Sequence, residues 1–331
     1  MVNTFVLIVT YGDHEAQLKT VLNKTLQNSR INHVFVVDNG STYSLVDRVE
    51  DVKSERVTLI SLNQNTGSAG GFGRGIREVV KYSMNDTDRL VILDDDSYIE
   101  GDALDKIEQY EQQTTTFGQQ VWSLNRLQLH ETVKPFGELF DYNNAYHYNS
   151  VYRFSMVNKV FPARFKVSRK SHNIRKLSFA PYSGLVLNVA TIKKIGYPQE
   201  EMFLYSDDIE YTFRISESGI NILQMYNANI RDIAGSWFNS KTINVHRAYF
   251  QGTENNFRAL YTYRNEAYLA ETIFKKNSLI YNINYFFWLL NIMIKHMPKT
   301  KKGWRQFKKI IVVSRQGRKK ELGQFEKQFL N

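Results

Sequence analysis

The chain has 331 residues, with 43 lysines and arginines against 33 aspartates and glutamates, so its formal net charge is +10. This length allows one large domain or a domain with an appendage. The absence of cysteine excludes disulfide bonds, thiolate metal sites and cysteine nucleophiles. The positive charge is compatible with nucleic acid, a phosphorylated substrate or an anionic membrane, and charge alone does not choose among these partners.

Apolar runs alternate with helical patterns along the N-terminal half of the chain. The pattern predicts strands over residues 5–9, 34–37, 57–62 and 90–93, and helices over residues 15–26 and from the segment 65–75 through residue 82. Continuous apolar strands interleaved with helices indicate an α/β fold, in which helices flank a mostly parallel, Rossmann-like sheet. Polar residues follow each of these strands. Because ligands of such sheets bind at the carboxyl ends of the strands, we expect the functional site there.

The C-terminal half is less regular. Residues 131–177 form an aromatic and basic stretch, which we interpret as irregular strands and loops. The pattern predicts a strand over residues 184–187, a helix over 189–195 and a further helix after the acidic cluster at 206–210. From about residue 255 the pattern is helical throughout. We therefore expect a main domain over residues 1–255 and a helical, basic region over residues 256–331.

Three consecutive carboxylates, Asp94, Asp95 and Asp96, follow the apolar run at 90–93. Crowded carboxylates repel one another unless a cation neutralises them, and a hard divalent cation accepts carboxylate and phosphate oxygens as ligands. In an extended chain Asp94 and Asp96 point to one side and Asp95 to the other. The pattern therefore predicts a divalent cation bound by Asp94 and Asp96, together with a phosphate-bearing substrate. The alternative is a solvated cap of a helix that starts near Asp102.

The segment from Asn65 to Gly75 is rich in glycine, with five glycines in nine positions from Gly67. Glycines let backbone amides approach a phosphate closely, and the start of the following helix favours anions. The segment lacks the lysine of a phosphate-binding loop, and it follows the third strand, whereas a dinucleotide fingerprint follows the first. It indicates a nucleotide without naming one. The alternative is a flexible turn with tight helix packing.

A second acidic pair, Asp207 and Asp208, precedes a helix predicted to begin near Ile209. An aspartate at this position commonly caps the helix, and it can also act as a general base toward an acceptor hydroxyl within hydrogen-bond reach. The pair alone favours the capping interpretation. Among the seven histidines, His246 is notable for its position between Asp208 and the tyrosine-rich segment 261–265.

Together these motifs resemble the family 2 glycosyltransferases, which have the GT-A fold, over roughly residues 3–265. The resemblance rests on Val9-Thr10-Tyr11, Val36 to Thr42, the segment 65–75, the three aspartates, Tyr182-Ser183-Gly184 and the later acidic pair. Within the family the sequence is most similar to bacterial galactofuranosyltransferases and the related rhamnosyltransferases. Those enzymes share a segment ending in Gly-Gly-Phe-x-Arg-Gly and a histidine ahead of a Tyr-x-x-Arg-Asn-like segment.

The resemblance implies a role for each matching residue. The implied donor-binding residues are Thr10, Asp38, Asn65, Gly67, Gly71, Arg74, Asp94 and Asp95, with Asp38 contacting a uracil or thymine base. Asp94, Asp96 and His246 are the implied ligands of Mn²⁺ or Mg²⁺. Asp208, beside Asp207 in the catalytic pair, is the implied base that deprotonates the acceptor hydroxyl. The chain departs from the pattern at Ser206, where galactofuranosyltransferases often have tryptophan, and this weakens the assignment of the donor sugar.

The resemblance therefore implies a metal-dependent, inverting glycosyltransferase that extends a surface polysaccharide or a lipid-linked glycan. The expected donor is UDP-galactofuranose, with dTDP-rhamnose as the alternative. A nucleotidyltransferase also combines acids with a glycine-rich loop, but its loop normally follows the first strand. Basic charge and abundant aromatics suggest a nucleic-acid-binding protein as a third reading. We expect no nucleic-acid partner, because the acidic clusters would line the cleft that receives the phosphates.

Residues 278–297 form an apolar, aromatic segment that is followed by a strongly basic run. The asparagines within it and the basic residues after it favour a helix that lies in a membrane interface over one that spans the bilayer. The alternative is a core helix packed on the main domain or on a second subunit of a homo-oligomer. Residues 1–11 form a strand-like run without a basic leader or a small-residue cleavage site, so we do not expect export by a signal peptide. We expect a cytoplasmic protein, peripheral at the inner face of the bacterial plasma membrane.

Overall fold

The computed structural model describes residues 2–114, 120–126, 148–152, 154–156, 160, 174–233, 245–252, 256–326 and 329, so most of the stretch 131–177 lies outside the described residues. The chain divides into two units. The first comprises Met1–Phe140, Ser171–Glu200 and Asp208–Asn239, and the second comprises Asp141–Lys170, Glu201–Asp207 and Ser240–Asn331. The second unit thus combines the predicted region 256–331 with earlier segments. The domain boundary expected at residue 255 stays a prediction.

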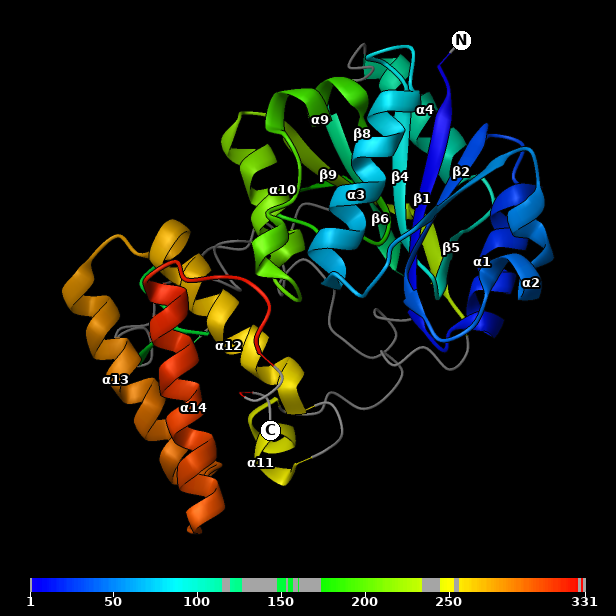
Figure 1. Ribbon diagram of the computed structural model, residues 1–331. Helices are drawn as coiled ribbons and strands as arrows, with labels where there is room; N and C mark the ends of the chain where they lie inside the picture. The colour runs from blue at the N-terminus through cyan, green and yellow to red at the C-terminus, as the bar shows by residue number, and fades with distance from the viewer. Residues whose placement is uncertain are drawn as a thin grey trace. The chain divides into compact units, whose positions relative to one another are not determined.

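A mixed β-sheet forms the centre of the first unit (Figure 1). Its described strands are β1 Thr4–Gly12, β2 His33–Ser41, β3 Val57–Ser61, β4 Arg89–Asp94, β5 Ser97–Ile99, β6 Gln120–Arg126, β7 Ile174–Leu177, β8 Leu185–Asn188 and β9 Asn221–Asp232. Their order is β3-β2-β1-β4-β8-β6-β9-β5, and β7 pairs with β9. Neighbours from β3 to β4 are parallel, whereas β8 is antiparallel to both β4 and β6.

The predicted α/β class is confirmed, and the parallel arrangement holds for the four N-terminal strands. Beyond β4 the sheet is mixed, since β9 runs parallel to β6 but antiparallel to β5 and β7. An apolar run predicts a buried strand, but it does not specify the direction in which that strand enters the sheet. For this reason the sequence could not show where the parallel part ends.

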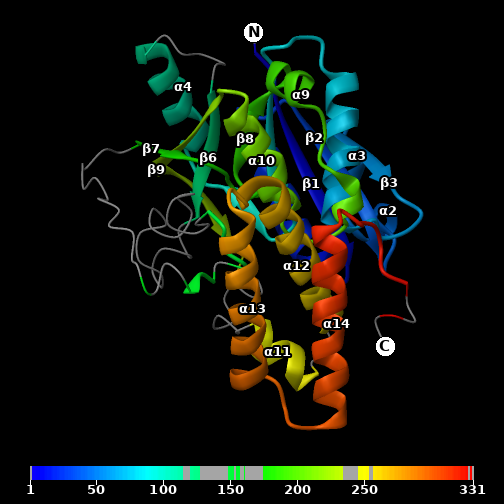
Figure 2. The ribbon, with the colours of Figure 1, turned by 90° about the vertical axis from the view of Figure 1, so that its left-hand side faces the viewer.

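Helices cover both faces of the sheet (Figures 1 and 2). One face carries α1 Glu15–Gln27, α2 Leu45–Arg48 and α4 Ala103–Thr114, and the other carries α3 Gly67–Tyr82, α9 Val189–Ile195 and α10 Asp207–Glu217. Successive side chains of a strand point to opposite faces. Val6 and Ile8 of β1 therefore belong to the core under α1, while Leu7 and Val9 belong to the core under α3.

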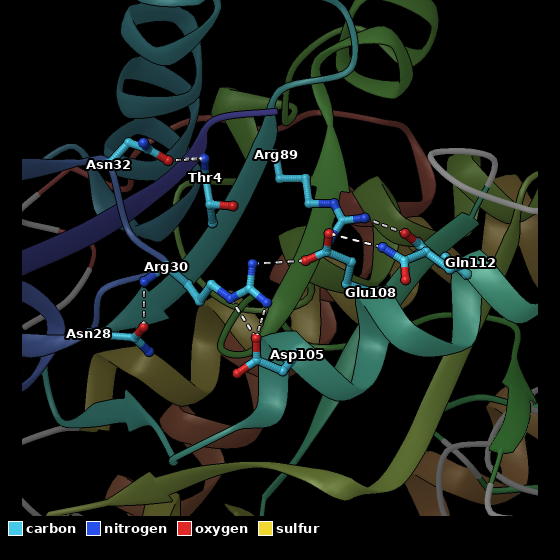
Figure 3. Close-up of polar contacts among 9 residues, drawn as sticks. Thr4, Asn28, Arg30, Asn32, Arg89, Asp105, Glu108 and Gln112 are labelled. Carbon is cyan, nitrogen blue, oxygen red and sulfur yellow. Dashed lines mark hydrogen bonds and ion pairs between the residues drawn. The ribbon is translucent and has the colours of Figure 1, made fainter. Parts of the chain in front are cut away.

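Ion pairs join α4 to neighbouring elements of the first unit. Arg30, in the loop before β2, faces Asp105 and Glu108 of α4 (Figure 3). Such half-exposed pairs contribute at most about 1 kcal/mol. Arg89 at the start of β4 pairs with Glu111 in the interior, and burial raises the pKa of the Glu111 carboxyl. Since neither charge is well solvated, loss of one partner matters far more there.

The described part of the second unit is mainly helical (Figure 2). It contains α11 Val245–Gln251, α12 Asn256–Leu269, a π-helical turn Ala270–Phe274, α13 Ser278–Lys295 and α14 Lys301–Arg318. Its core contains several aromatic residues, including Tyr249, Tyr263 and Trp288. A Cβ at Gly317 of α14 would lie 2.0 Å from the carbonyl oxygen of Arg264, so this glycine permits the close packing of α14 on α12. Within the described residues, no helix is long and apolar enough to cross a membrane.

Candidate functional site

The carboxyl ends of β1, β2 and β4 bring predicted site residues to one edge of the sheet. In the parallel ladders Thr10 of β1 lies opposite Asp38 of β2, and Val9 lies opposite Asp94 of β4. Thr10 is buried, whereas Asp38 and Asp94 are partly exposed. The residue predicted to contact the base and a predicted metal ligand therefore lie on either side of the end of β1.

Asn39, the next residue of β2, ties this edge to the start of α3. Its Nδ2 donates to the carbonyl of Gly67 at 2.8 Å, and its Oδ1 accepts from the amide and the hydroxyl of Thr66 at 2.8 and 2.9 Å. Asn65 Oδ1 accepts from the amide of Gly67 at 2.8 Å. Because Asn39 is buried, its three bonds fix the backbone that leads into the helix. The sequence analysis assigned no role to this residue.

The glycine-rich segment begins a helix, because α3 starts at Gly67. A Cβ at Gly71 would lie 2.7 Å from Val9 Cγ1, and a Cβ at Gly75 would lie 2.3 Å from Leu7 Cδ1. Both glycines therefore permit close packing of α3 on β1, as the alternative interpretation of this segment expected. The backbone amides at the N-terminus of α3 are the part suited to an anion.

Arg74 lies on the surface of α3, where its side chain is half-exposed and pairs with Glu78 at 3.1 Å. It is one turn or more into the helix, past the terminal amides that favour anions. The donor-binding roles of Asn65, Gly67, Gly71 and Arg74 stay predictions.

The three aspartates form the end of β4 and the turn that leads to β5. The amide of Asp94 donates to Ser183 Oγ at 3.3 Å. Asp95 is buried, and its Oδ2 lies 2.9 Å from His14 Nδ1. The carboxylates of Asp94 and Asp96 instead face the guanidinium of Arg126. Asp95 therefore makes a different contact from Asp94 and Asp96, and residues 95 and 96 form a turn instead of the extended chain on which the predicted opposition was based.

Arg126, the last residue of β6, faces the carboxylates of Asp94 and Asp96. Its Nη2 lies 3.8 Å from Asp94 Oδ2 and 3.6 Å from Asp96 Oδ1, and its Nε donates to Asp232 Oδ1 at 2.7 Å. Burial acts to lower the pKa of Arg126, but the carboxylates of Asp94, Asp232 and Asp96 outweigh it and raise that pKa. The guanidinium therefore stays charged and neutralises part of the acidic cluster. The sequence analysis missed Arg126 and Asp232 because both end strands that it did not predict.

Asp208 is close enough to this cluster to act on Asp94 electrostatically. It lies at the N-terminus of α10, where its Oδ1 accepts a hydrogen bond from the following amide at 2.8 Å. Burial raises the pKa of Asp94 to about 7; Asp96, Asp95 and Asp208 add to the rise, and Arg126 opposes it. Protein atoms crowd the Asp94 carboxylate, yet 38% of the side chain is exposed, so solvent moderates this effect. Four carboxylates therefore share one electrostatic environment.

Asp94 and Asp96 fit a divalent cation as part of its ligand set. Among the described residues, no group of three or more aspartate, glutamate and histidine side chains could hold a metal ion by itself. Asp96 Oδ1 is buried and has no hydrogen-bond partner in the described part of the chain, so its lone pairs suit a cation. Mg²⁺ commonly binds through one or two carboxylates, with substrate phosphates and water completing its shell. The pair thus suits a cation that binds together with a phosphate-bearing ligand.

His246 and Asp207 belong to the second unit. Nδ1 of His246, on α11, lies 2.7 Å from the hydroxyl of Tyr263, and the two rings stack with centroids 5.6 Å apart. Burial, and next the neighbouring His296, lower the pKa of His246 to about 4. The imidazole is therefore neutral at physiological pH, which is the form that binds metals. Asp207 is buried at the start of α10. The metal-binding role of His246 and the catalytic role of Asp207 stay predictions.

The fold and the site together define an α/β protein with an acidic edge at the ends of its parallel strands, suited to a cation and a phosphate-bearing ligand. Residues 3–258 match the family described as glycosyltransferase like family 2. The chain therefore belongs to that family, and the resemblance stated from the sequence is confirmed.

Two relatives of described activity are each 24% identical to this chain. One is the low-salt glycan biosynthesis hexosyltransferase Agl10 of Haloferax volcanii, matched over 66% of this chain and 63% of its own length. The other is the dTDP-rhamnosyl transferase RfbF of Shigella flexneri, matched over 66% of this chain and 64% of its own length. The chain thus spans just under two thirds of the length of these relatives.

Two solved structures share the fold. The crystal structure of S. aureus TarS residues 1–349 has a TM-score of 0.51 and 14% identity, and the match covers 96% of this chain and 81% of that one. The structure of GalNAc-T7 with UDP, GalNAc and Mn²⁺ has a TM-score of 0.53 and 11% identity, with coverage of 91% and 59%. These likenesses confirm the GT-A fold.

Proposed function

We propose that this protein is a metal-dependent, inverting glycosyltransferase that moves a sugar from a UDP or dTDP donor to a growing surface polysaccharide or lipid-linked glycan. The observation that carries the proposal is the shared environment of Asp94, Asp95, Asp96 and Asp208 beside the end of β1. Arg126 neutralises only part of this acidic cluster, and a divalent cation together with a phosphate-bearing ligand would neutralise the rest. Membership of the family and the hexosyltransferase relative support the same reaction class.

Four aspartates and the backbone amides at the start of α3 each have a separate role in the proposed reaction. Asp38 contacts the base of the donor, and the amides at the start of α3 bind the diphosphate. Asp94 and Asp96 would hold Mn²⁺ or Mg²⁺, and a bound ion would supply positive charge to offset the charge of the departing nucleoside diphosphate. Asp208 accepts the proton of the acceptor hydroxyl while its oxygen attacks the anomeric carbon. The bond from that carbon to the diphosphate breaks in the same displacement, so the configuration inverts.

The donor sugar has two candidates. UDP-galactofuranose is the donor implied by the sequence motifs, including the helix-forming segment that ends in Gly75. dTDP-rhamnose is favoured by the match to the rhamnosyl transferase of Shigella flexneri, and by Ser206 at a position where galactofuranosyltransferases often have tryptophan. UDP-galactofuranose and dTDP-rhamnose are therefore both candidate donors, and a binding experiment can distinguish them.

A panel of nucleotide sugars tests the proposal. Thermal unfolding of the full chain is measured with UDP-galactofuranose, UDP-galactose, dTDP-rhamnose and GDP-mannose, each with Mn²⁺, with Mg²⁺ and with EDTA. A donor at a hundred times its dissociation constant stabilises the folded state by about 2.7 kcal/mol. We expect one donor to raise the melting temperature, and EDTA to remove most of the rise. If no nucleotide sugar stabilises the protein with either ion, the proposed function is wrong.

We also propose that the second unit binds an anionic membrane surface through α13. One face of this helix is buried in the core of the unit through Tyr281, Asn284, Trp288 and Ile292. The opposite face is an apolar stripe that remains exposed, with Leu279 at 70%, Phe286 at 58% and Ile294 at 75% exposure. The complete apolar stripe consists of Leu279, Ile283, Phe286, Phe287 and Ile294. Ile283, Phe286, Phe287 and Ile294 lie 4, 7, 8 and 15 residues after Leu279, and these offsets place all five side chains on one helix face.

Charge favours an anionic lipid surface as the partner of the apolar stripe. Exposed basic residues lie at the end of the helix and directly after it: Lys295, Lys299, Lys301, Lys302 and Arg305. Trp304 among them is 48% exposed, and tryptophan is enriched where apolar and aqueous phases meet. Each basic residue near an anionic surface adds about 1 kcal/mol to binding. An apolar helix face bordered by basic residues is typical of helices that lie in the membrane interface.

Vesicle binding tests this surface. The full chain should sediment with vesicles that contain phosphatidylglycerol and not with vesicles of phosphatidylcholine alone. A double variant, Phe286→Glu with Ile294→Glu, should weaken binding at least about tenfold, because two buried apolar side chains are lost. Val46→Glu is the matched control, since Val46 is an exposed apolar residue of α2 in the first unit. If the double variant binds vesicles normally but converts a dimer to a monomer in sedimentation, the apolar stripe is a subunit contact and the membrane proposal is wrong.

A further inference from the structure

The backbone that leads into the acidic pair of α10 is strained. Phe203, Tyr205 and Ser206 have φ angles of 63°, 67° and 63°, which lie in the left-handed region. Residues with a Cβ rarely adopt this region, and three of them within four positions is unusual. Strained backbone of this kind persists only where its surroundings fix it, and it is concentrated at functional sites. The strained segment Glu201–Ser206 ends directly before Asp207, so contacts from other elements must hold it in this conformation.

Asn265 of α12 supplies much of that fixation. Its side chain is fully buried, and its Nδ2 lies 2.8 Å from each of three backbone carbonyls, those of Met202, Leu204 and Tyr205. Three acceptors around one nitrogen require a donor there, which determines the orientation of the amide. One side chain thus gathers the carbonyls of the segment into a single arrangement.

Arg264, the preceding residue of α12, holds the other side of the segment. Its buried guanidinium donates to the carbonyl of Met202 at 2.9 Å and to the carbonyl of Gly323. It also lies over the rings of Tyr261 and Phe325, with centroid distances of 5.0 and 4.7 Å. Burial lowers the pKa of Arg264 to about 10, with Tyr261 opposing the shift, so the guanidinium is still charged at neutral pH.

Ser206 is tied to the same helix. Its hydroxyl lies 3.3 Å from Glu266 Oε1 and donates to it. Three successive residues of α12 therefore contact the segment: Arg264, Asn265 and Glu266. The tyrosine-rich segment 261–265, which the sequence analysis singled out without a role of its own, belongs to this support.

We infer that Arg264 and Asn265 are positioning residues, which hold Glu201–Ser206 in its strained conformation and thereby fix the backbone that leads into Asp207 and Asp208. The structural part of this inference concerns the backbone alone. The expected effect on turnover rests on the proposed function, in which Asp208 is the base that takes the proton from the acceptor hydroxyl. A base displaced by about 1 Å loses on the order of 100-fold in turnover, while nucleotide binding by other residues is unaffected.

Asn265→Asp tests the inference, because it keeps the shape of the side chain and replaces the donor with a carboxylate that repels the three carbonyls. Hydrogen exchange of the amides of residues 202–206 should accelerate at least about tenfold, as expected when a local opening becomes easier. The matched control is Asn284→Asp. Asn284 is also fully buried in the second unit and donates to the carbonyl of Asn149, remote in sequence from the segment. The control should lower stability without selective exchange at 202–206.

The kinetic readouts separate this inference from the proposed function. Asn265→Asp should lower kcat about 100-fold, with the dissociation constant of UDP or dTDP in the presence of Mn²⁺ within twofold of the unmodified chain. Combined with Asp208→Asn it should cause little further loss, because residues that act through one group are not additive. Additive losses, or normal exchange at 202–206, would overturn the positioning role. Absence of nucleotide binding in the unmodified chain would instead count against the proposed function, and the exchange result would still decide the positioning role.

If Asn265→Asp does not fold, Asn265→Gln replaces it. Glutamine keeps the amide donor but moves it by one methylene, so it should retain part of the protection of residues 202–206 and part of the turnover. The inference would be contradicted by two results together. The first is full protection of residues 202–206 and full turnover in Asn265→Gln. The second is normal exchange at residues 202–206 in an Arg264→Lys variant that is less stable than the unmodified chain.

Discussion

Replacing Asn39 with alanine removes the contacts that tie the end of β2 to the start of α3. The side chain makes three hydrogen bonds of 2.8 to 2.9 Å, and it is almost completely buried. Each such bond contributes about 1 kcal/mol, and the groups of Thr66 and Gly67 that lose a partner are left poorly solvated. We therefore expect Asn39→Ala to lower the free energy of unfolding by roughly 3 kcal/mol.

The assay is urea unfolding of the full chain, followed by the nucleotide-induced rise in melting temperature. The control is Asn32→Ala, because Asn32 is an exposed asparagine that accepts one bond, from the amide of Thr4 at 2.8 Å (Figure 3). The control should cost less than about 1 kcal/mol and leave nucleotide binding unchanged. Asn39→Ala should also weaken nucleotide binding, since the backbone ahead of α3 loses its support. Equal stability of the two variants would refute the reasoning that burial makes the Asn39 bonds decisive.

Further predictions concern the acids, the interior ion pair and the helix packing. Asp96→Asn should abolish transfer with the correct donor, and Asp208→Asn should lower it by about 10²–10⁴-fold, while circular dichroism and urea unfolding stay close to those of the unmodified chain; full activity in either would contradict its assigned role. Arg89→Met should destabilise by about 3–5 kcal/mol above neutral pH, as calorimetry would show. Burial already raises the pKa of Glu111 and Arg89 opposes that rise, so part of the lost stability should return as the pH falls and the carboxyl takes up a proton. Gly75→Ala should cost about 1–3 kcal/mol in urea unfolding, because its Cβ would meet a leucine of β1 at 2.3 Å; an unchanged midpoint would show that the helix can shift without cost.

Local sequence patterns predicted strands that consist of contiguous apolar runs and helices whose apolar residues have helical spacing. The helix predicted over residues 189–195 coincides with α9, and the strand predicted over 90–93 lies within β4. The patterns missed β6 and β9, whose buried residues include polar side chains such as Asn125, Arg126 and Asp232. A strand with polar residues in the interior lacks the apolar run on which such a prediction depends.

By itself the sequence determined the α/β class, the family resemblance and the three aspartates at the end of β4, because these depend on residues that are neighbours along the chain. Only the tertiary structure decided which groups surround those aspartates. Arg126 and Asp232 are 106 positions apart in the sequence, yet they form a hydrogen bond. The side chain of Asn265 contacts carbonyls that lie 60 to 63 positions before it. It also decided that Gly71 and Gly75 serve helix packing, since a Cβ there would meet side chains of β1. Contacts of this kind have no periodicity along the chain, and they exist only once the sheet and the helices have assembled.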